Sequence, residues 1–97
     1  MKRKTLLIRC DARQAALLAE ALSTYAEAAY PRGGSECAQA ARETLLDSAA
    51  VIARDAGGDG AEVSRRQRGL LRTAIRWYWD ERGEPRQAAS FLDLLER

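Results

Sequence analysis

The stretch from Asp11 to Tyr30, DARQAALLAEALSTYAEAAY, has the spacing of an amphipathic helix. Asp11 is a good N-cap residue, and Gln14 three positions later completes a capping-box pattern. Glu20 and Glu27 fall off the apolar face and are expected to meet water. Apolar side chains recur at the helical spacing, at Ala15, Leu18, Leu22, Tyr25 and Ala29.

Turn residues downstream of this helix predict a second one of similar length. The turn PRGG at 31–34 ends the first helix, because proline cannot continue it and the glycines admit left-handed backbone. Ser35 is a suitable N-cap for a second helix that runs to about Ala56, and the turn GGDG follows at 57–60.

The last third of the chain predicts two more helices. Asp59 and Glu62 repeat the capping-box pattern before a predicted third helix over about 61–82. Gly83 suits the left-handed position after that helix, and Pro85 suits the first turn of a short last helix that continues to about residue 96.

Residues 5–10, TLLIRC, predict a short N-terminal strand. In a strand, Leu6, Ile8 and Cys10 share one face, and Leu7 lies on the other. A helical start is the alternative, because leucine suits either state. The predicted fold class is therefore mainly α, with three long helices, a short C-terminal helix and a short N-terminal strand.

The length of 97 residues predicts one small domain, residues 1–97, with a thin core. Apolar residues make up 46% of the chain, but 19 of them are alanine, which favours close helix packing and contributes little apolar area. A homodimer that completes the core is the expected state. The chain has neither a membrane-length apolar stretch nor a signal-peptide pattern, so a cytoplasmic location is expected.

Few residues are suited to catalysis or metal binding. The chain has no histidine, so Ser-His and Cys-His nucleophile pairs are excluded. Cys10 and Cys37, the only cysteines, cannot complete a zinc site within one chain, and both are interpreted as reduced and half-buried. Carboxylate pairs such as Glu43 with Asp47 are interpreted as surface acids. We therefore expect no enzyme, no cofactor and no metal.

Charge is distributed unevenly around a net value of +2. Residues 1–10 carry four basic side chains and no acid, residues 11–60 carry four basic against eight acidic ones, and residues 61–97 carry eight basic against six acidic ones. The middle of the chain is thus acidic and both ends are basic.

An arginine stripe lies on the predicted third helix. Its members, three or four residues apart, share one helical face: Arg65, Arg68, Arg72 and Arg76, with Arg66 beside them. Such a stripe can follow phosphates, dock on an acidic protein surface, pair within the protein or simply face water.

Three consecutive aromatic residues, Trp77, Tyr78 and Trp79, follow the stripe. Because they lie 100° apart on a helix, they cannot all point inward, and at least one is expected at the surface or in an interface. Trp77 and Trp79 are therefore candidate partner-binding residues, together with the arginine stripe.

The basic N-terminus, Lys2, Arg3 and Lys4, precedes the predicted strand that ends near Arg9. With the later Gly34-Ser35-x-Cys37 turn, this half of the chain resembles the ribbon-helix-helix DNA-binding proteins. That resemblance implies a strand paired across a dimer, with Thr5 and Arg9 as base-contacting positions. Two features depart from that family. The first predicted helix is about two turns longer than its counterpart there, and Leu7 occupies the strand position where a polar, base-contacting side chain is usual.

These observations predict a non-enzymatic binding protein that docks on a protein partner, as an inhibitor, antitoxin or accessory factor. An origin in a phage or mobile element would fit the size of the chain. The alternative is a DNA-binding regulator of the ribbon-helix-helix type, which would use Lys2, Arg3, Lys4 and Arg9 and the arginine stripe. A structural subunit of a larger assembly is a third hypothesis.

Overall fold

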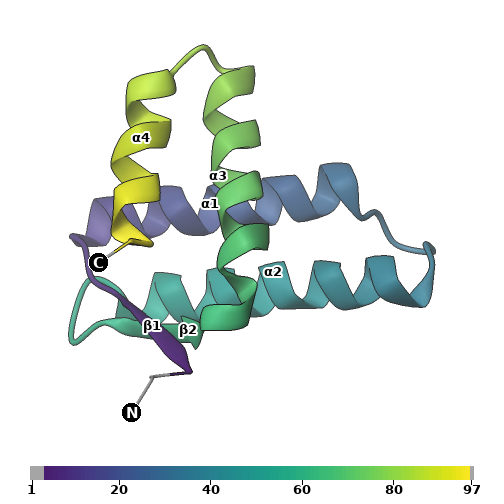
Figure 1. Ribbon diagram of the computed structural model, residues 1–97, viewed down its shortest axis with the longest axis horizontal. Helices are drawn as coiled ribbons and strands as arrows, with labels where there is room; N and C mark the ends of the chain where they lie inside the picture. Colours follow the sequence, from purple (N-terminus) through teal and green to yellow (C-terminus); the bar gives the residue numbers. More distant parts are fainter. Residues whose placement is uncertain (1–3, 97) are drawn as a thin grey trace.

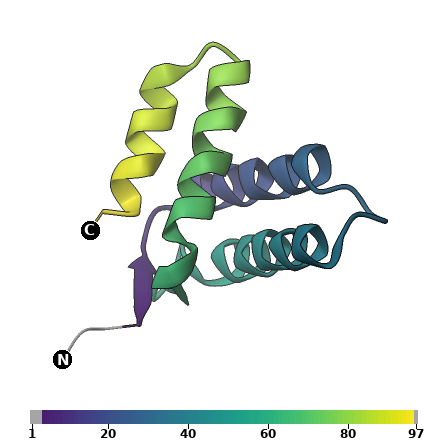
Figure 2. The ribbon, with the colours of Figure 1, turned by 45° about the vertical axis from the view of Figure 1, so that its right-hand side comes forward.

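Two pairs of helices and a small sheet make up the structure, a computed structural model that describes residues 4–96. Figure 1 shows helices α1 and α2 side by side in opposite directions, with α3 and α4 lying across them as a second pair. Figure 2 shows the same crossing from an oblique direction. In chain order the elements are β1 (Thr5–Ile8), α1 (Ala12–Ala29), α2 (Glu36–Asp55), β2 (Ala61–Ser64), the 3-10 helix η1 (Arg65–Gln67), α3 (Arg68–Glu81) and α4 (Pro85–Leu94).

The predicted caps define where the long helices begin. The Asp11 carboxylate accepts a hydrogen bond from the Gln14 backbone N–H at 2.7 Å, and the Gln14 side chain accepts one from the Asp11 N–H at 3.0 Å. The Ser35 hydroxyl accepts a bond from the Ala38 N–H at 3.2 Å. Each cap satisfies backbone donors that have no partner inside the helix, so the predicted starts of α1 and α2 are confirmed.

The core lies where the two helix pairs cross and extends to the inner face of the sheet. Its largest fully buried side chains come from β1, from α1 to α3 and from the residue that caps the end of α4: Ile8, Leu18, Leu22, Leu45, Ile52, Leu71, Ile75 and Leu95. The predicted N-terminal strand is confirmed, and its two faces differ as the alternation requires, because Leu6 and Ile8 are buried while Leu7 is exposed. Cys10 is half-buried as predicted, but Cys37 is exposed.

The prediction of a helix over about 61–82 is wrong in its first part. Residues 61–64 form β2, which pairs antiparallel with β1 so that Leu6 lies opposite Val63 and Ile8 lies opposite Ala61. Glu62 therefore faces outward from a strand and does not cap a helix. The reason is tertiary, because Ala61 and Val63 alternate into the core, and burial on one face of a sheet overrides helix propensity. The α-helix begins at Arg68.

The same pairing separates the chain from the ribbon-helix-helix arrangement. The resemblance implied that the N-terminal strand pairs with its counterpart in a second chain. Here β1 pairs with β2 of the same chain, and the two strands form a two-stranded sheet. The Arg65 N–H also donates to the Lys4 carbonyl at 2.9 Å, which continues the pairing beyond the strands.

Candidate functional site

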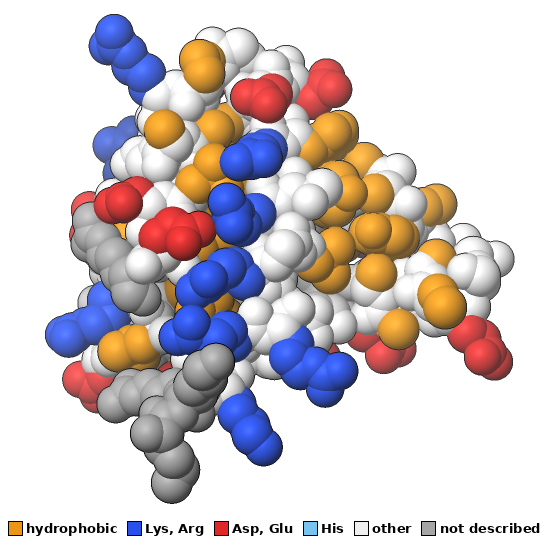
Figure 3. Space-filling model, viewed as in Figure 1, with side chains coloured by type: hydrophobic (Ala, Val, Ile, Leu, Met, Phe, Trp, Pro, Cys, Tyr) orange, Lys and Arg blue, Asp and Glu red, His pale blue; other side chains and the backbone are white. Residues whose placement is uncertain are grey.

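The arginine residues form a row along η1 and α3. Arg65 and Arg66 lie in η1, Arg68 opens α3, and Arg72 and Arg76 follow on the helix. Arg65, Arg66 and Arg76 are exposed, and Arg68 and Arg72 are half-buried. Figure 3 shows basic side chains gathered in a column over α3 and over its N-terminal end at η1, which we call the foot of α3. The predicted stripe is thus one surface feature, although its first two members belong to the 3-10 turn.

Most of this arginine row has no counter-charge within the described residues 4–96. Arg72 contacts Glu96 of the C-terminal turn at 3.5 Å, with both side chains about half exposed. The other described ion pairs join Arg42 to Glu27 and Arg54 to Asp55, away from the row. An exposed pair such as Arg72–Glu96 adds little stability, so the row keeps most of its positive field.

Arg68 has a buried donor without a partner. Its Nε atom is excluded from solvent and makes no hydrogen bond to the described residues. A buried donor left unpaired costs about 1–3 kcal/mol. Arg68 is half-buried and lies between Arg65 and Arg72 in the row.

An aromatic cluster lies beside the row. The ring of Trp77 packs on Tyr25 of α1 with centroids 5.5 Å apart, and Tyr25 meets Tyr30 edge to face at 5.9 Å. All three side chains are half-buried. Burial, and then the neighbouring Tyr30, raise the pKa of the Tyr25 hydroxyl. We call Tyr25, Tyr30 and Trp77 the aromatic cluster.

Arg42 of α2 fixes the Tyr30 end of the aromatic cluster. Its side chain is only 8% exposed. The guanidinium group donates one hydrogen bond to the Tyr30 carbonyl at 3.2 Å and another to the Glu27 carboxylate at 2.6 Å. The hydrogen bond from Arg42 lowers the pKa of the Glu27 carboxyl. Because these bonds fix the end of α1 against α2, the position of Tyr30 beside Tyr25 is determined by the fold.

Trp79 lies in the core and not on this surface. It is 3% exposed and stacks on Phe91 of α4 with centroids 4.3 Å apart and planes 9° from parallel. Tyr78, next to it, is also buried and carries the Arg82 guanidinium 3.6 Å above its ring. Of the two tryptophans named as candidate partner-binding residues, only Trp77 reaches the surface.

The residues of the predicted basic arm are separated by the fold. Lys2 and Arg3 lie outside the described residues. Lys4 borders a surface hollow of about 450 Å³ together with Ser64, Arg65 and Arg66. Arg9 lies at the other end of β1, near the turn at Gly60. Lys4 thus joins the foot of the arginine row, and Arg9 does not.

Other parts of the described chain offer little chemistry. Burial, and then the charge of Asp11, raise the pKa of the Cys10 thiol, which disfavours the thiolate. Residues 4–96 contain no group of three or more His, Cys, Asp or Glu side chains placed to hold a metal ion. No helix in that range is both long and apolar enough to cross a membrane.

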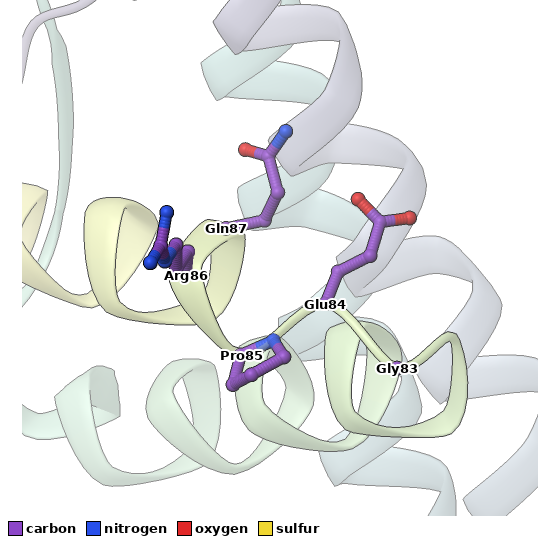
Figure 4. Close-up of a pocket in the computed structure, with 5 residues that line it drawn as sticks. All are labelled: Gly83, Glu84, Pro85, Arg86 and Gln87. Carbon is purple, nitrogen blue, oxygen red and sulfur yellow. The ribbon is translucent and has the colours of Figure 1, made fainter.

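A smaller hollow of about 290 Å³ lies in the turn between α3 and α4. Figure 4 shows that Glu84 and Gln87 extend to the same side of this turn, while Pro85 points away from them. Among the described lining residues, the hollow combines one acidic side chain, Glu84 at the N-cap of α4, with one basic side chain, Arg86 in its first turn, and this arrangement selects no particular ligand.

The arginine row was predicted from spacing, but its neighbours were not. Tyr25 was assigned to the apolar stripe of α1, and Tyr30 to the end of that helix. These two tyrosines join Trp77 only because α3 packs across α1, a contact that no local sequence pattern indicates. The chain matches no protein-family model, and comparisons with curated proteins and with solved structures give no match either.

Proposed function

We propose that this protein is a non-enzymatic docking protein, and that its contact surface is the face of α3 formed by the arginine row and the aromatic cluster. The observation that supports this most directly is the half-buried Trp77–Tyr25–Tyr30 cluster lying next to Arg76. Tryptophan, tyrosine and arginine are the residues enriched at energetically important positions of protein interfaces.

The proposed partner is a protein with an acidic surface around an apolar pocket. Trp77 would fill the pocket, and Arg72 and Arg76 would orient the partner through carboxylates. The expected biological roles are those of an inhibitor, an antitoxin or an accessory factor in the cytoplasm. A homodimer is proposed as well, and light scattering of the purified protein tests it.

A photo-crosslinking amino acid placed at position 76 tests the docking surface. A crosslink to one defined protein is expected from position 76 and not from position 87, which is exposed on α4. For the captured partner, Trp77→Ala is expected to weaken binding by about 2 kcal/mol, roughly 30-fold, if Trp77 is a hot spot. Leu7→Ala, at an exposed leucine on the sheet, serves as the matched control. Equal binding by both variants would rule the surface out.

A DNA-binding regulator is the second candidate. It is favoured by the continuation of the arginine row into Lys4 at the foot of α3, which lengthens the positive surface. Binding to random-sequence duplex DNA at about 50 and about 200 mM salt tests it, because affinity for phosphates falls steeply as salt rises. Absence of binding at the lower salt concentration would exclude this candidate.

A further inference from the structure

We infer that the hollow at the foot of α3, bordered by Lys4, Ser64, Arg65 and Arg66, is a binding site for an oligophosphate group. This inference does not depend on the proposed docking to a protein, in which Trp77, Arg72 and Arg76 make the stated contacts. It concerns a small anionic ligand, which the four described lining residues would recognise.

The hollow is built from two segments far apart in the sequence. Lys4 precedes β1, and Ser64 to Arg66 close β2 and form η1. Thr5 lies opposite Ser64 in the sheet, and the Arg65 N–H donates to the Lys4 carbonyl at 2.9 Å. The backbone of Lys4 is therefore held beside η1, which brings its ammonium group and the two guanidinium groups to one hollow.

Ser64 orders the turn that carries the two arginines. Its hydroxyl oxygen accepts a hydrogen bond from the Arg66 N–H at 3.3 Å and so caps η1. The hydroxyl hydrogen takes no part in that bond and can be donated to an anion. Ser64 thus contributes a neutral donor between the charged ones.

The charges of the hollow are uncompensated among the described residues. Within residues 4–96, three cationic side chains line it with no acid between them, and no ion pair in that range involves any of the three. Like charges gathered in one place repel each other, and a bound anion removes that repulsion. By contrast, the hollow at the opposite end of the sheet is lined by Asp55, Asp59 and Glu62, and its one arginine, Arg54, bonds to Asp55.

The type of donor favours phosphate. Arginine presents a planar fork of N–H donors that matches two oxygens of one phosphate, and lysine acts as a point charge. Two forks, an ammonium and a hydroxyl offer more donors than a single carboxylate has acceptor sites. The volume of about 450 Å³ falls in the range of small-molecule sites, so there is room for more than one phosphoryl group.

The described lining contains no aromatic residue on which a base could stack. Recognition would therefore rest on the phosphates and not on a base. The same chemistry is offered by a free oligophosphate and by the backbone of a nucleic acid, and the experiment has to separate these two sources.

Isothermal titration of the full-length protein with inorganic pyrophosphate at about 20 mM salt tests the site, because low salt preserves surface electrostatics. Saturable binding at one site per chain is expected. The double variant Arg65→Gln/Arg66→Gln should weaken it at least 10-fold. The matched control is Arg13→Gln/Arg86→Gln, which removes the same net charge at two exposed positions away from the hollow and should bind as the parent does.

A second variant and a second ligand complete the test. Lys4→Gln leaves η1 intact and should also weaken binding, so a folding defect in the double variant would not decide the outcome. The second ligand is a short thymidine oligonucleotide without terminal phosphate. If it competes with pyrophosphate, the site accepts the backbone of a nucleic acid; if it does not compete, the ligand is a free oligophosphate. Absence of saturable pyrophosphate binding, or an equal loss in the control variant, would overturn the inference.

Discussion

Trp79 and Trp77 lie two residues apart on α3, and the structure predicts opposite consequences of replacing them with alanine. Trp79 is 3% exposed, stacks on Phe91 at 4.3 Å, and meets the Tyr78 ring edge to face at 4.9 Å. Removal of a buried tryptophan costs about 3–5 kcal/mol, and the lost ring pairs place the expected value in the upper half of that range. Trp79→Ala should therefore lower the free energy of unfolding by about 4–5 kcal/mol.

The size of this loss matters because small domains have little stability to spare. A chain of 97 residues is expected to unfold with a free energy of about 5–15 kcal/mol. A loss of about 4–5 kcal/mol would remove nearly all of the stability at the lower end of that range and about a third of it at the upper end. Helix α4 should detach first, because Phe91 loses its stacking partner. Trp79→Phe, which keeps an aromatic ring against Phe91, should lose clearly less.

Trp77→Ala should behave differently, because Trp77 is only half-buried, packing against the core and against the ring of Tyr25. We expect a loss of about 1–2 kcal/mol from the partial burial of its ring. Its main effect should be on binding, as proposed for the docking surface.

Urea unfolding followed by far-UV circular dichroism measures both variants on the same scale. Each variant retains one tryptophan, so fluorescence also reports whether the remaining ring stays in a folded environment. The reasoning would be refuted if Trp77→Ala were the more destabilised of the two, or if Trp79→Ala lost less than about 1 kcal/mol, because neither fits a buried stacked ring.

Three further predictions concern stability. Arg42→Leu should destabilise the protein by about 2–3 kcal/mol, because it removes hydrogen bonds that fix the end of α1, and thermal unfolding will measure the loss. The lowered pKa of Glu27 means that its bond to Arg42 stabilises the fold fully above the ordinary value of 4.5 and less as pH falls through the lowered pKa. The urea midpoint should therefore fall in acid less steeply in Glu27→Gln, and identical pH profiles would contradict this. Gly60→Ala should be destabilising, because Gly60 has a φ of 109° and an added Cβ would lie 2.6 Å from the Leu7 side chain. Gly69→Ala on α3 meets nothing within 4 Å and should stabilise the helix by up to about 1 kcal/mol, so equal effects at the two glycines would be evidence against the turn geometry.

The long helices were predictable because the signals that define them are local. The capping box of Asp11 and Gln14, the cap of Ser35 and the apolar spacing of α1 all lie within a few residues of the structure they specify. The positive φ of Gly83 likewise confirms the predicted end of α3. Each of these features is decided by backbone hydrogen bonding at a helix end, which a short stretch of sequence describes well.

Strand β2 was not predictable in the same way. Its four residues, AEVS, contain two good helix formers and follow a turn that could cap a helix. They form a strand because their backbone pairs with the edge of β1, more than fifty residues earlier, and because Ala61 and Val63 are then buried in the core. No window around residues 61–64 contains that information.

The surface was predictable in its charge and not in its aromatic part. Helical spacing placed Arg68, Arg72 and Arg76 on one face of α3 without knowledge of the fold. The same spacing required that Trp77 and Trp79 point in different directions. Which of them is buried depends on where α4 packs, because Phe91 is the residue that covers Trp79.

The one segment that sequence patterns assigned wrongly is also the segment that builds the oligophosphate hollow. Had residues 61–67 been helical, Arg65 and Arg66 would have continued the α3 surface, and Lys4 would have had no fixed neighbour among them. Because β2 pairs with β1, the chain turns sharply at Ser64 and brings Lys4 to the two arginines. The cations converge through a tertiary pairing, so a ligand that binds them should also protect the β1–β2 pairing. Slower amide hydrogen exchange at Arg65 on addition of pyrophosphate would show this coupling, because the Arg65 N–H is the donor that joins the two segments.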